Sequence, residues 1–195
     1  MSKANLLDRR AVVAHLLKDR NGAIAVGGLG ASTYDIAAAG DDARNFYLWG
    51  AMGGAVMIGL GLALAQPKLP VIVITGDGEM LMGLGSLATV GAQKPANLSI
   101  VVLDNEAYGE TGGQVSHTAT SVDLVGVAKA CGIADSRAIT TMAEVEAFAL
   151  SLKEADGPRF ANVKIDGANL ERVLSNRDGT FIVNRLRGSL GYQPI

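Results

Sequence analysis

The sequence predicts a single α/β domain over residues 1–195. We expect a three-layer sandwich in which helices cover both faces of a mostly parallel sheet of about six strands. Residues 70–75 and 98–103 favour this fold, because both are short apolar runs rich in β-branched residues, and each run ends in a polar loop. A chain of 195 residues is long enough for one such domain with a substantial core and too short for two ordinary ones.

The other elements follow from the pattern of apolar residues. Runs of apolar residues predict further strands at residues 23–26, 45–49 and 159–165. Helical spacing predicts helices at residues 6–19, 32–39, 51–65, 80–91, 122–131 and 142–155, and a closing helix with a surface tail in the final stretch. Thr141, with Glu144 three residues later, predicts a capping box at the start of the helix from Met142.

Composition and charge argue against several classes of function. A net charge of −2 and a pI near 5.7 give no basic surface for nucleic acid or for an anionic membrane. The longest apolar run, residues 51–65, is too short and too rich in glycine to span a bilayer, so it predicts a buried helix. The single cysteine, Cys131, suits a reducing compartment and no signal peptide is recognised, so we expect a cytoplasmic protein.

Polar side chains follow the two central strands. Gly76 and Gly78 allow a tight turn after the first, with Asp77 between them, and Asn105 follows the second. The carboxyl ends of parallel strands meet at one edge of the sheet, so Asp77 and Asn105 should be neighbours. A carboxylate and an amide oxygen suit Mg²⁺, and the helix that starts beside them suits a phosphate. An isolated Gly-Asp-Gly, by contrast, would indicate only a turn.

The spacing of these residues favours a diphosphate site. Gly76-Asp77-Gly78 is followed by 26 residues and then Asn105. This pattern resembles the signature GDG-X(24–28)-N of thiamine-diphosphate-dependent enzymes. The residues between them also read as a helix, a turn and an apolar strand, in the order that the signature requires. The resemblance implies thiamine diphosphate and Mg²⁺ as cofactors.

Further motifs narrow the resemblance. They are Asn45-Phe46-Tyr47, Gly50-Ala51-Met52-Gly53, Asp104-Asn105 and Tyr108-Gly109-Glu110-Thr111-Gly112-Gly113-Gln114. In this order they are similar to the diphosphate-binding half of sulfopyruvate decarboxylase and phosphonopyruvate decarboxylase, over about residues 9–132. The resemblance implies a PP-type domain, named for the cofactor's diphosphate, and a decarboxylase that acts on a small 2-oxo acid.

The resemblance also implies roles for individual residues. The metal ligands would be the Asp77 and Asn105 side chains and the main-chain carbonyl of Ala107. Met52 would support the bent cofactor, and Thr111, Gln114 and His117 would lie near the substrate as catalytic residues. The full set expected to bind the cofactor is Gly30, Ser32, Gly50, Ala51, Met52, Gly76, Asp77, Gly78, Glu79, Asn105, Ala107, Tyr108, Gly109 and Thr111.

Two positions depart from the family pattern. Glu79 stands where these decarboxylases more often have a small residue, although GDG-Glu resembles the transketolase-like branch. Its carboxylate must point away from a diphosphate or face the water shell of the metal, because like charges repel at short range. The family's Ser-Arg-Glu is replaced by Ser32-Thr33-Tyr34-Asp35, which removes a cation and leaves the preference for sulfonate or phosphonate open.

The resembling enzymes activate the cofactor with a glutamate from a separate pyrimidine-binding domain. No such second domain fits in this sequence. We therefore expect a β-type subunit, with an α-type subunit of similar size supplying that glutamate in a hetero-oligomer such as α2β2 or larger. A carboligase subunit, a transketolase-like subunit and a non-catalytic regulatory subunit are alternatives. A nicotinamide-binding module fits less well, because Gly28-x-Gly30 lacks the rest of the glycine fingerprint.

Overall fold

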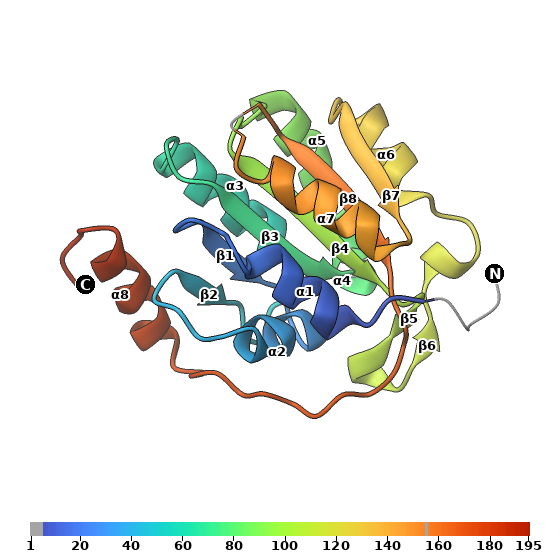
Figure 1. The fold of residues 1–195 in the computed structure, drawn as a ribbon, viewed down its shortest axis with the longest axis horizontal. Helices are drawn as coiled ribbons and strands as arrows, with labels where there is room; N and C mark the ends of the chain where they lie inside the picture. The colour runs from blue at the N-terminus through green and yellow to red at the C-terminus, as the bar shows by residue number, and fades with distance from the viewer. Residues whose placement is uncertain (1–5, 155) are drawn as a thin grey trace.

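The computed structural model describes residues 6–154 and 156–195 and contains a six-stranded parallel sheet (Figure 1). The strand order is β2-β1-β3-β4-β8-β7, and helices lie on both faces, so the expected three-layer fold is confirmed. The strands are β1 (Ile24–Gly27), β2 (Asn45–Tyr47), β3 (Val71–Gly76), β4 (Leu98–Asp104), β7 (Asp135–Ile139) and β8 (Arg159–Lys164).

The central strands are apolar on both faces because each face packs against a layer of helices. In β3, Ile72 and Ile74 belong to one hydrophobic cluster, while Val71 and Val73 belong to the other. Such a strand reads as a continuous apolar run, which is why β3 and β4 were recognisable in the sequence. Both end at the same edge of the sheet, with Gly76 paired to Leu103 in the parallel register.

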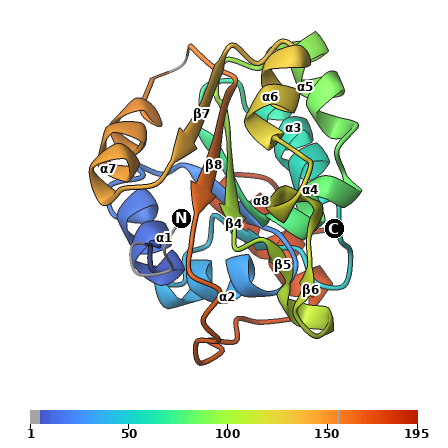
Figure 2. The same cartoon turned by 90° about the vertical axis from the view of Figure 1, so that its right-hand side faces the viewer.

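The helices divide between the two faces, as Figure 2 shows. One face carries α1 (Arg9–Leu17), α2 (Ala31–Ala38) and α7 (Met142–Ser151), whose buried residues share one cluster. The other face carries α3 (Ala55–Ala65), α4 (Asp77–Met82), α5 (Ser86–Gln93) and α6 (Leu124–Ala130). The predicted capping box is confirmed, since the Thr141 hydroxyl accepts from the Glu144 N–H at 3.3 Å and Glu144 accepts from Thr141 N at 3.0 Å.

The structure corrects some of the predicted elements. The helix predicted at residues 80–91 is two helices, because α4 starts already at Asp77 and ends before Gly83. A Cβ on Gly83 would lie 2.4 Å from the carbonyl oxygen of Gly53, so another loop approaches closely where the helix breaks. Strand β7 was not predicted. The helix predicted at residues 142–155 is shorter, because α7 ends at Ser151. Residue 155 and the chain start at residues 1–5, where no signal peptide is expected, lie outside the described residues.

The C-terminal segment runs from β8 back to β2 at one border of the sheet. After β8 the chain runs over residues 166–178 without regular secondary structure and then forms α8 (Gly179–Ser189) beside β2 (Figure 1). Trp49 Nε1 donates a hydrogen bond of 3.1 Å to the carbonyl of Asn176, and Arg185 Nη2 donates one of 3.2 Å to the carbonyl of Asn45. These contacts hold the segment and α8 against the first third of the chain.

Within residues 6–154 and 156–195, no helix combines the length and the apolar character needed to cross a membrane.

Candidate functional site

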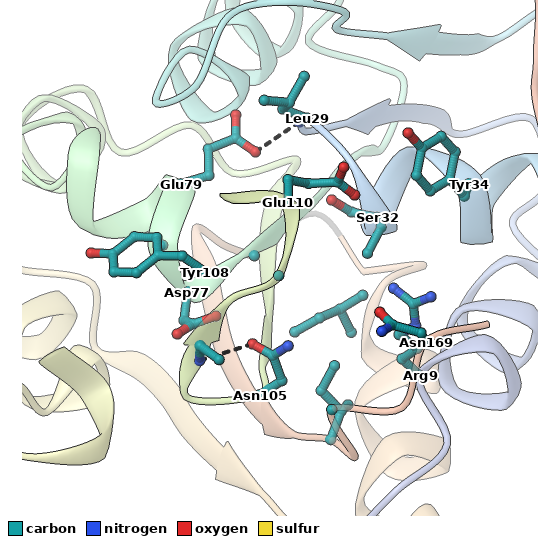
Figure 3. Close-up of a pocket in the computed structure, with 18 of the residues that line it drawn as sticks. Arg9, Leu29, Ser32, Tyr34, Asp77, Glu79, Asn105, Tyr108, Glu110 and Asn169 are labelled. Carbon is teal, nitrogen blue, oxygen red and sulfur yellow. Dashed lines mark hydrogen bonds between the residues drawn. The ribbon is translucent and has the colours of Figure 1, made fainter. Parts of the chain in front are cut away.

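A cavity of about 300 Å³ lies where β1, β3 and β4 end (Figure 3). The loops that follow these strands form its walls, and the C-terminal segment from Asp166 closes another side. The lining residues include Leu29 and Ser32 after β1, Met52 after β2, Asp77, Gly78 and Glu79 after β3, Asn105, Ala107, Tyr108, Gly109, Glu110 and Thr111 after β4, and Arg9, Tyr34, Asn169 and Arg172 from the remaining walls.

Asp77 is a buried carboxylate at the start of α4. Its side chain lines the cavity although the residue is 2% exposed. Oδ2 accepts hydrogen bonds from the hydroxyls of Ser116 and, at 3.2 Å, Thr118. Burial raises the pKa of Asp77, the hydroxyls of Ser116 and Thr118 oppose this rise, and the nearby Asp104 carboxylate adds to it. A cation in the cavity would compensate this buried charge.

Asn105 lies beside Asp77 at the same end of the cavity, as Figure 3 shows. Its Oδ1 accepts a hydrogen bond of 3.1 Å from the N–H of Ala107, which closes a tight turn at the end of β4. The chain then forms a small antiparallel hairpin of β5 (Ala107–Tyr108) and β6 (Gln114–Val115). The predicted metal ligands are therefore brought to one place, with Ala107 also lining the cavity.

The oxygen atoms of these three residues are suitable ligands for a hard cation. One carboxylate, one amide oxygen and one carbonyl leave room for water and phosphate oxygens around Mg²⁺. Within the described residues there is no group of three or more His, Cys, Asp or Glu side chains placed to hold a metal. The predicted set does not depend on such a group, because only one of its three ligands is an acidic side chain.

Ser32 fits an anionic ligand, and Gly78 lets the Tyr108 ring pack beside it. Ser32 is 2% exposed in the first turn of α2, and its buried Oγ has no hydrogen-bond partner among the described residues. An unsatisfied hydroxyl next to free N–H groups at a helix start is a favourable place for a phosphate. A Cβ on Gly78 would lie 2.5 Å from the ring of Tyr108, so only glycine lets the ring pack there. These features fit the diphosphate of the expected cofactor.

Glu79 turns toward the glycine loop after β1. Its Oε2 accepts a hydrogen bond of 3.0 Å from the Leu29 N–H (Figure 3). It also accepts one of 2.8 Å from the Thr75 hydroxyl. The residue is 4% exposed, and burial raises the pKa of its carboxyl even though both hydrogen bonds lower it. The carboxylate of Glu79 is thus bonded to the loop after β1 and to the end of β3. A Cβ on Gly28 would lie 1.8 Å from Oε2, so this contact requires glycine.

Some predicted residues lie outside the cavity wall. Thr111 lines the cavity but Gln114 and His117 do not, and neither do Gly30, Gly50 and Ala51. The Thr111 hydroxyl donates to Gln114 Oε1 at 3.0 Å, and Gln114 Nε2 donates to the Thr111 carbonyl at 2.8 Å. Gln114 and His117 are exposed. The catalytic roles expected for Thr111, Gln114 and His117 remain predictions.

The sequence did not point to several residues of the site. Ser116 and Thr118 hold Asp77 from 39 and 41 residues away, and Arg9, Tyr34 and Arg172 complete the cavity wall. A faint signal was present, since Ser116 and Thr118 are two hydroxyl residues on either side of His117 in a polar loop. No spacing rule connects Arg9 or Arg172 with the strands, because α1 and the C-terminal segment bring them there.

Comparison with known proteins agrees with this geometry. The family described as "Thiamine pyrophosphate enzyme, C-terminal TPP binding domain" matches residues 28–163. The sulfopyruvate decarboxylase subunit beta of Methanothermobacter thermautotrophicus is 41% identical over 145 residues, which cover 74% of this chain and 75% of that subunit. Phosphonopyruvate decarboxylase of Streptomyces viridochromogenes is 40% identical over 160 residues, covering 82% of this chain.

The chain spans 39% of the length of the Streptomyces enzyme, so it corresponds to a part of that protein. Among solved structures, benzoylformate decarboxylase from Polynucleobacter necessarius has the same fold, with a TM-score of 0.69 and 21% identity over 86% of this chain and 34% of that one. The resemblance that the motifs indicated is confirmed. The family match covers more than half of the chain and includes Asp77, Asn105 and the glycine turn, and the chain therefore belongs to the thiamine pyrophosphate enzymes, as their C-terminal TPP-binding domain.

Proposed function

We propose that this chain is the β-type subunit of a split thiamine-diphosphate-dependent decarboxylase of small 2-oxo acids. The observation that carries the proposal is the meeting of the Asp77 carboxylate, the Asn105 amide and Ala107 at one end of a cavity. The relatives named as beta subunits of sulfopyruvate decarboxylase support it, because one of them aligns over 75% of its own length.

In this proposal each part of the cavity has a separate task. Asp77, Asn105 and the carbonyl of Ala107 hold Mg²⁺, and the metal together with the N–H groups of Gly78 and Glu79 holds the diphosphate. The hydroxyl of Ser32, which has no partner within the described part of the chain, donates to the same diphosphate. Met52, an adaptable side chain in the cavity wall, supports the cofactor's bent form. When bound, thiamine diphosphate supplies the electron sink for loss of CO₂ from the 2-oxo acid.

The glutamate that activates the cofactor would come from an α-type partner subunit. The glutamates near the cavity are already engaged in this chain. Glu79 is bonded to Leu29 and Thr75, Glu106 pairs with Lys164 at 2.7 Å, and Glu110 pairs with Arg172 at 3.5 Å. A hetero-oligomer with an active site shared between the subunits is the simplest arrangement that completes the chemistry. The single free cysteine, Cys131, suits such an enzyme in the cytoplasm.

Native mass spectrometry of the protein isolated from its own source is the first test. We expect a complex with a second subunit of similar size that carries thiamine diphosphate. The complex should then convert one member of a panel of 2-oxo acids, including sulfopyruvate and phosphonopyruvate, into CO₂ and the corresponding aldehyde.

The other outcomes select the alternatives. An acyloin product would indicate a carboligase, and full activity of the complex after Asp77→Ala would indicate a non-catalytic subunit. Robust decarboxylation by the purified single chain would contradict the split arrangement.

A further inference from the structure

Lys164 connects the loops that carry the expected metal ligands, although it does not line the cavity. It is the last residue of β8, next to the end of β4 in the sheet. Its Nζ lies 2.7 Å from Asp104 Oδ2 and 2.7 Å from Glu106 Oε1. Asp104 and Glu106 are the two neighbours of Asn105 in the sequence, so one ammonium group holds both sides of that ligand.

Asp104 is a fully engaged buried carboxylate. It is 1% exposed, and its Oδ2 accepts from Lys164 and, at 2.8 Å, from Asn162 Nδ2. Its Oδ1 accepts from the Glu106 N–H at 3.1 Å and from the Thr118 hydroxyl at 2.8 Å. A buried carboxylate needs a positive partner, and removing that partner leaves an uncompensated charge. Lys164 provides this compensation from the side of the sheet.

Glu106 has a backbone conformation that residues other than glycine rarely adopt, with φ at 62°. Besides the hydrogen bond from its N–H to Asp104, two contacts hold it there. Its side chain pairs with Lys164, and its carbonyl accepts a hydrogen bond of 2.9 Å from the Ser116 N–H. This conformation turns the chain directly between Asn105 and Ala107, the second and third expected ligands. Loss of the Lys164 pair would therefore loosen the turn that sets their relative positions.

The network continues to Asp77 through two hydroxyls. Thr118 Oγ1 lies 2.8 Å from Asp104 Oδ1 and 3.2 Å from Asp77 Oδ2, and 2.8 Å from Ser116 Oγ. The single proton of the Thr118 hydroxyl makes a three-centre hydrogen bond, with its shorter arm to Asp104 Oδ1 and its longer arm to Asp77 Oδ2, while Ser116 donates to Asp77 Oδ2. These contacts fix the Asp77 carboxylate on its Oδ2 side and leave Oδ1 for a cation.

We propose that Lys164 is a positioning residue for the metal ligands, acting on Asn105 and Ala107 through Asp104 and Glu106, and on Asp77 through Asp104 and Thr118. The inference rests on the proposed function, because it assigns the Asp77, Asn105 and Ala107 oxygens to a divalent cation. Groups that orient metal ligands commonly change metal affinity 10- to 100-fold when they are removed. Lys164 has this role without touching the cation or the substrate.

The test is Mn²⁺ binding to the full chain, purified with whatever subunit accompanies it, in the presence of thiamine diphosphate. Electron paramagnetic resonance of free Mn²⁺ gives the dissociation constant without any activity measurement. We expect Lys164→Met to raise that constant by about 10- to 100-fold, and Lys164→Arg to recover part of the loss. Lys129→Met, at an exposed lysine of α6, is the matched control and should leave the constant unchanged.

A purely structural lysine would give a different result. It would lower the midpoint of thermal unfolding in Lys164→Met while the Mn²⁺ dissociation constant of the folded protein stayed within about twofold of the wild type, and that outcome would overturn the proposal. If Lys164→Met does not fold, Glu106→Met and Thr118→Val decide, because each removes one arm of the network. Both should weaken Mn²⁺ binding, and unchanged binding in both would equally overturn the proposal.

Failure of the proposed function gives a separate result. If the wild-type protein binds no Mn²⁺ with thiamine diphosphate, the assignment of the cavity as a metal site falls, and the role of Lys164 falls with it. If the wild type binds Mn²⁺ and Lys164→Met binds it equally well, the cavity keeps its function and only the positioning role is lost.

Discussion

The carboxylate of Glu79 accepts a hydrogen bond of 3.0 Å from the main-chain N–H of Leu29. The residue directly after the Gly76-Asp77-Gly78 turn therefore holds the glycine loop at the end of β1. Two walls of the cavity, contributed by neighbouring strands, are joined through one buried side chain. Glu79 thus has a structural role within this chain.

Two substitutions of Glu79 distinguish the role of its hydrogen-bonding oxygen from the role of its charge. Glu79→Gln keeps an oxygen that accepts from Leu29, and burial already disfavours the charged form, so its free energy of unfolding should stay within about 1 kcal/mol of the wild type. Glu79→Ala leaves the Leu29 N–H and the Thr75 hydroxyl without their acceptor and should cost about 2 to 3 kcal/mol. Urea unfolding measures both, and equal losses would contradict this account.

Asp77 should show a conflict between stability and ligand binding. Burial raises the pKa of Asp77, so at pH 7 its ionised carboxylate costs stability in the protein without ligand. Asp77→Asn should therefore unfold at the same or a higher temperature than the wild type when no cofactor is added. With Mg²⁺ and thiamine diphosphate at 100 times the dissociation constant, the wild type should gain about 2.7 kcal/mol.

The Asp77→Asn variant should gain little from the same additions, which differential scanning fluorimetry can measure. The Ser116 hydroxyl can still donate a hydrogen bond to the amide oxygen of Asn at position 77, so the fold around this position should persist. A variant that lost stability in the absence of cofactor, or that kept the full gain, would show that this carboxylate is structural.

Two glycines of α3 form a matched pair. A Cβ on Gly59 would lie 2.2 Å from Val73 Cγ2, whereas a Cβ on Gly61 would meet nothing within 4 Å. Gly59→Ala should destabilise the protein by about 1 to 3 kcal/mol, because the helix would have to move away from β3. Gly61→Ala should stabilise it by about 0.5 to 1 kcal/mol through helix propensity alone. Chemical denaturation of both variants tests the contact, and similar effects at the two positions would refute it.

The capping box of α7 predicts how the stability of the protein depends on pH. Hydrogen bonds from the backbone of Thr140, the hydroxyl of Thr141 and the backbone of Thr141 lower the pKa of Glu144 below its ordinary value of 4.5. A lowered acidic pKa contributes stability that is present above pH 4.5 and is lost as the pH falls through the folded-state pKa. Glu144→Gln lacks this titration.

We therefore expect the difference in unfolding free energy between the wild type and Glu144→Gln to shrink as the pH falls from about 6 to 3. Denaturant midpoints at several pH values give this difference. A difference that stays constant over the range would contradict a role for the Glu144 charge in the box.

The sequence was sufficient to predict features that depend on short-range interactions or on the general geometry of a parallel sheet. The continuous apolar runs of β3 and β4 predict buried central strands, and their shared edge brings Asp77 and Asn105 together. The capping box from Thr141 to Glu144 was also predictable, because its partners are three residues apart. These features can be predicted from short segments of sequence without knowledge of the rest of the chain.

Contacts between distant segments were not predictable. Strand β7 has a mixed pattern of buried and exposed residues and exists because it pairs with β8. The break between α4 and α5 lies against the carbonyl of Gly53, thirty residues earlier. The hydrogen bond from Ser116 to Asp77 forms because the loop after β6 folds back onto α4. Only the assembled fold brings these groups together.

The position of α8 has a consequence for self-association. Strand β2 has three residues and forms one border of the sheet, where backbone groups on its outer side face no further strand. Such exposed edges invite pairing with strands of other molecules and thereby aggregation. Arg185 of α8 occupies the outward carbonyl of Asn45, and the helix packs beside the strand. A chain that ends at residue 178 lacks α8 and should therefore expose the unpaired edge of β2. We expect it to form oligomers through this edge, which size-exclusion chromatography would detect.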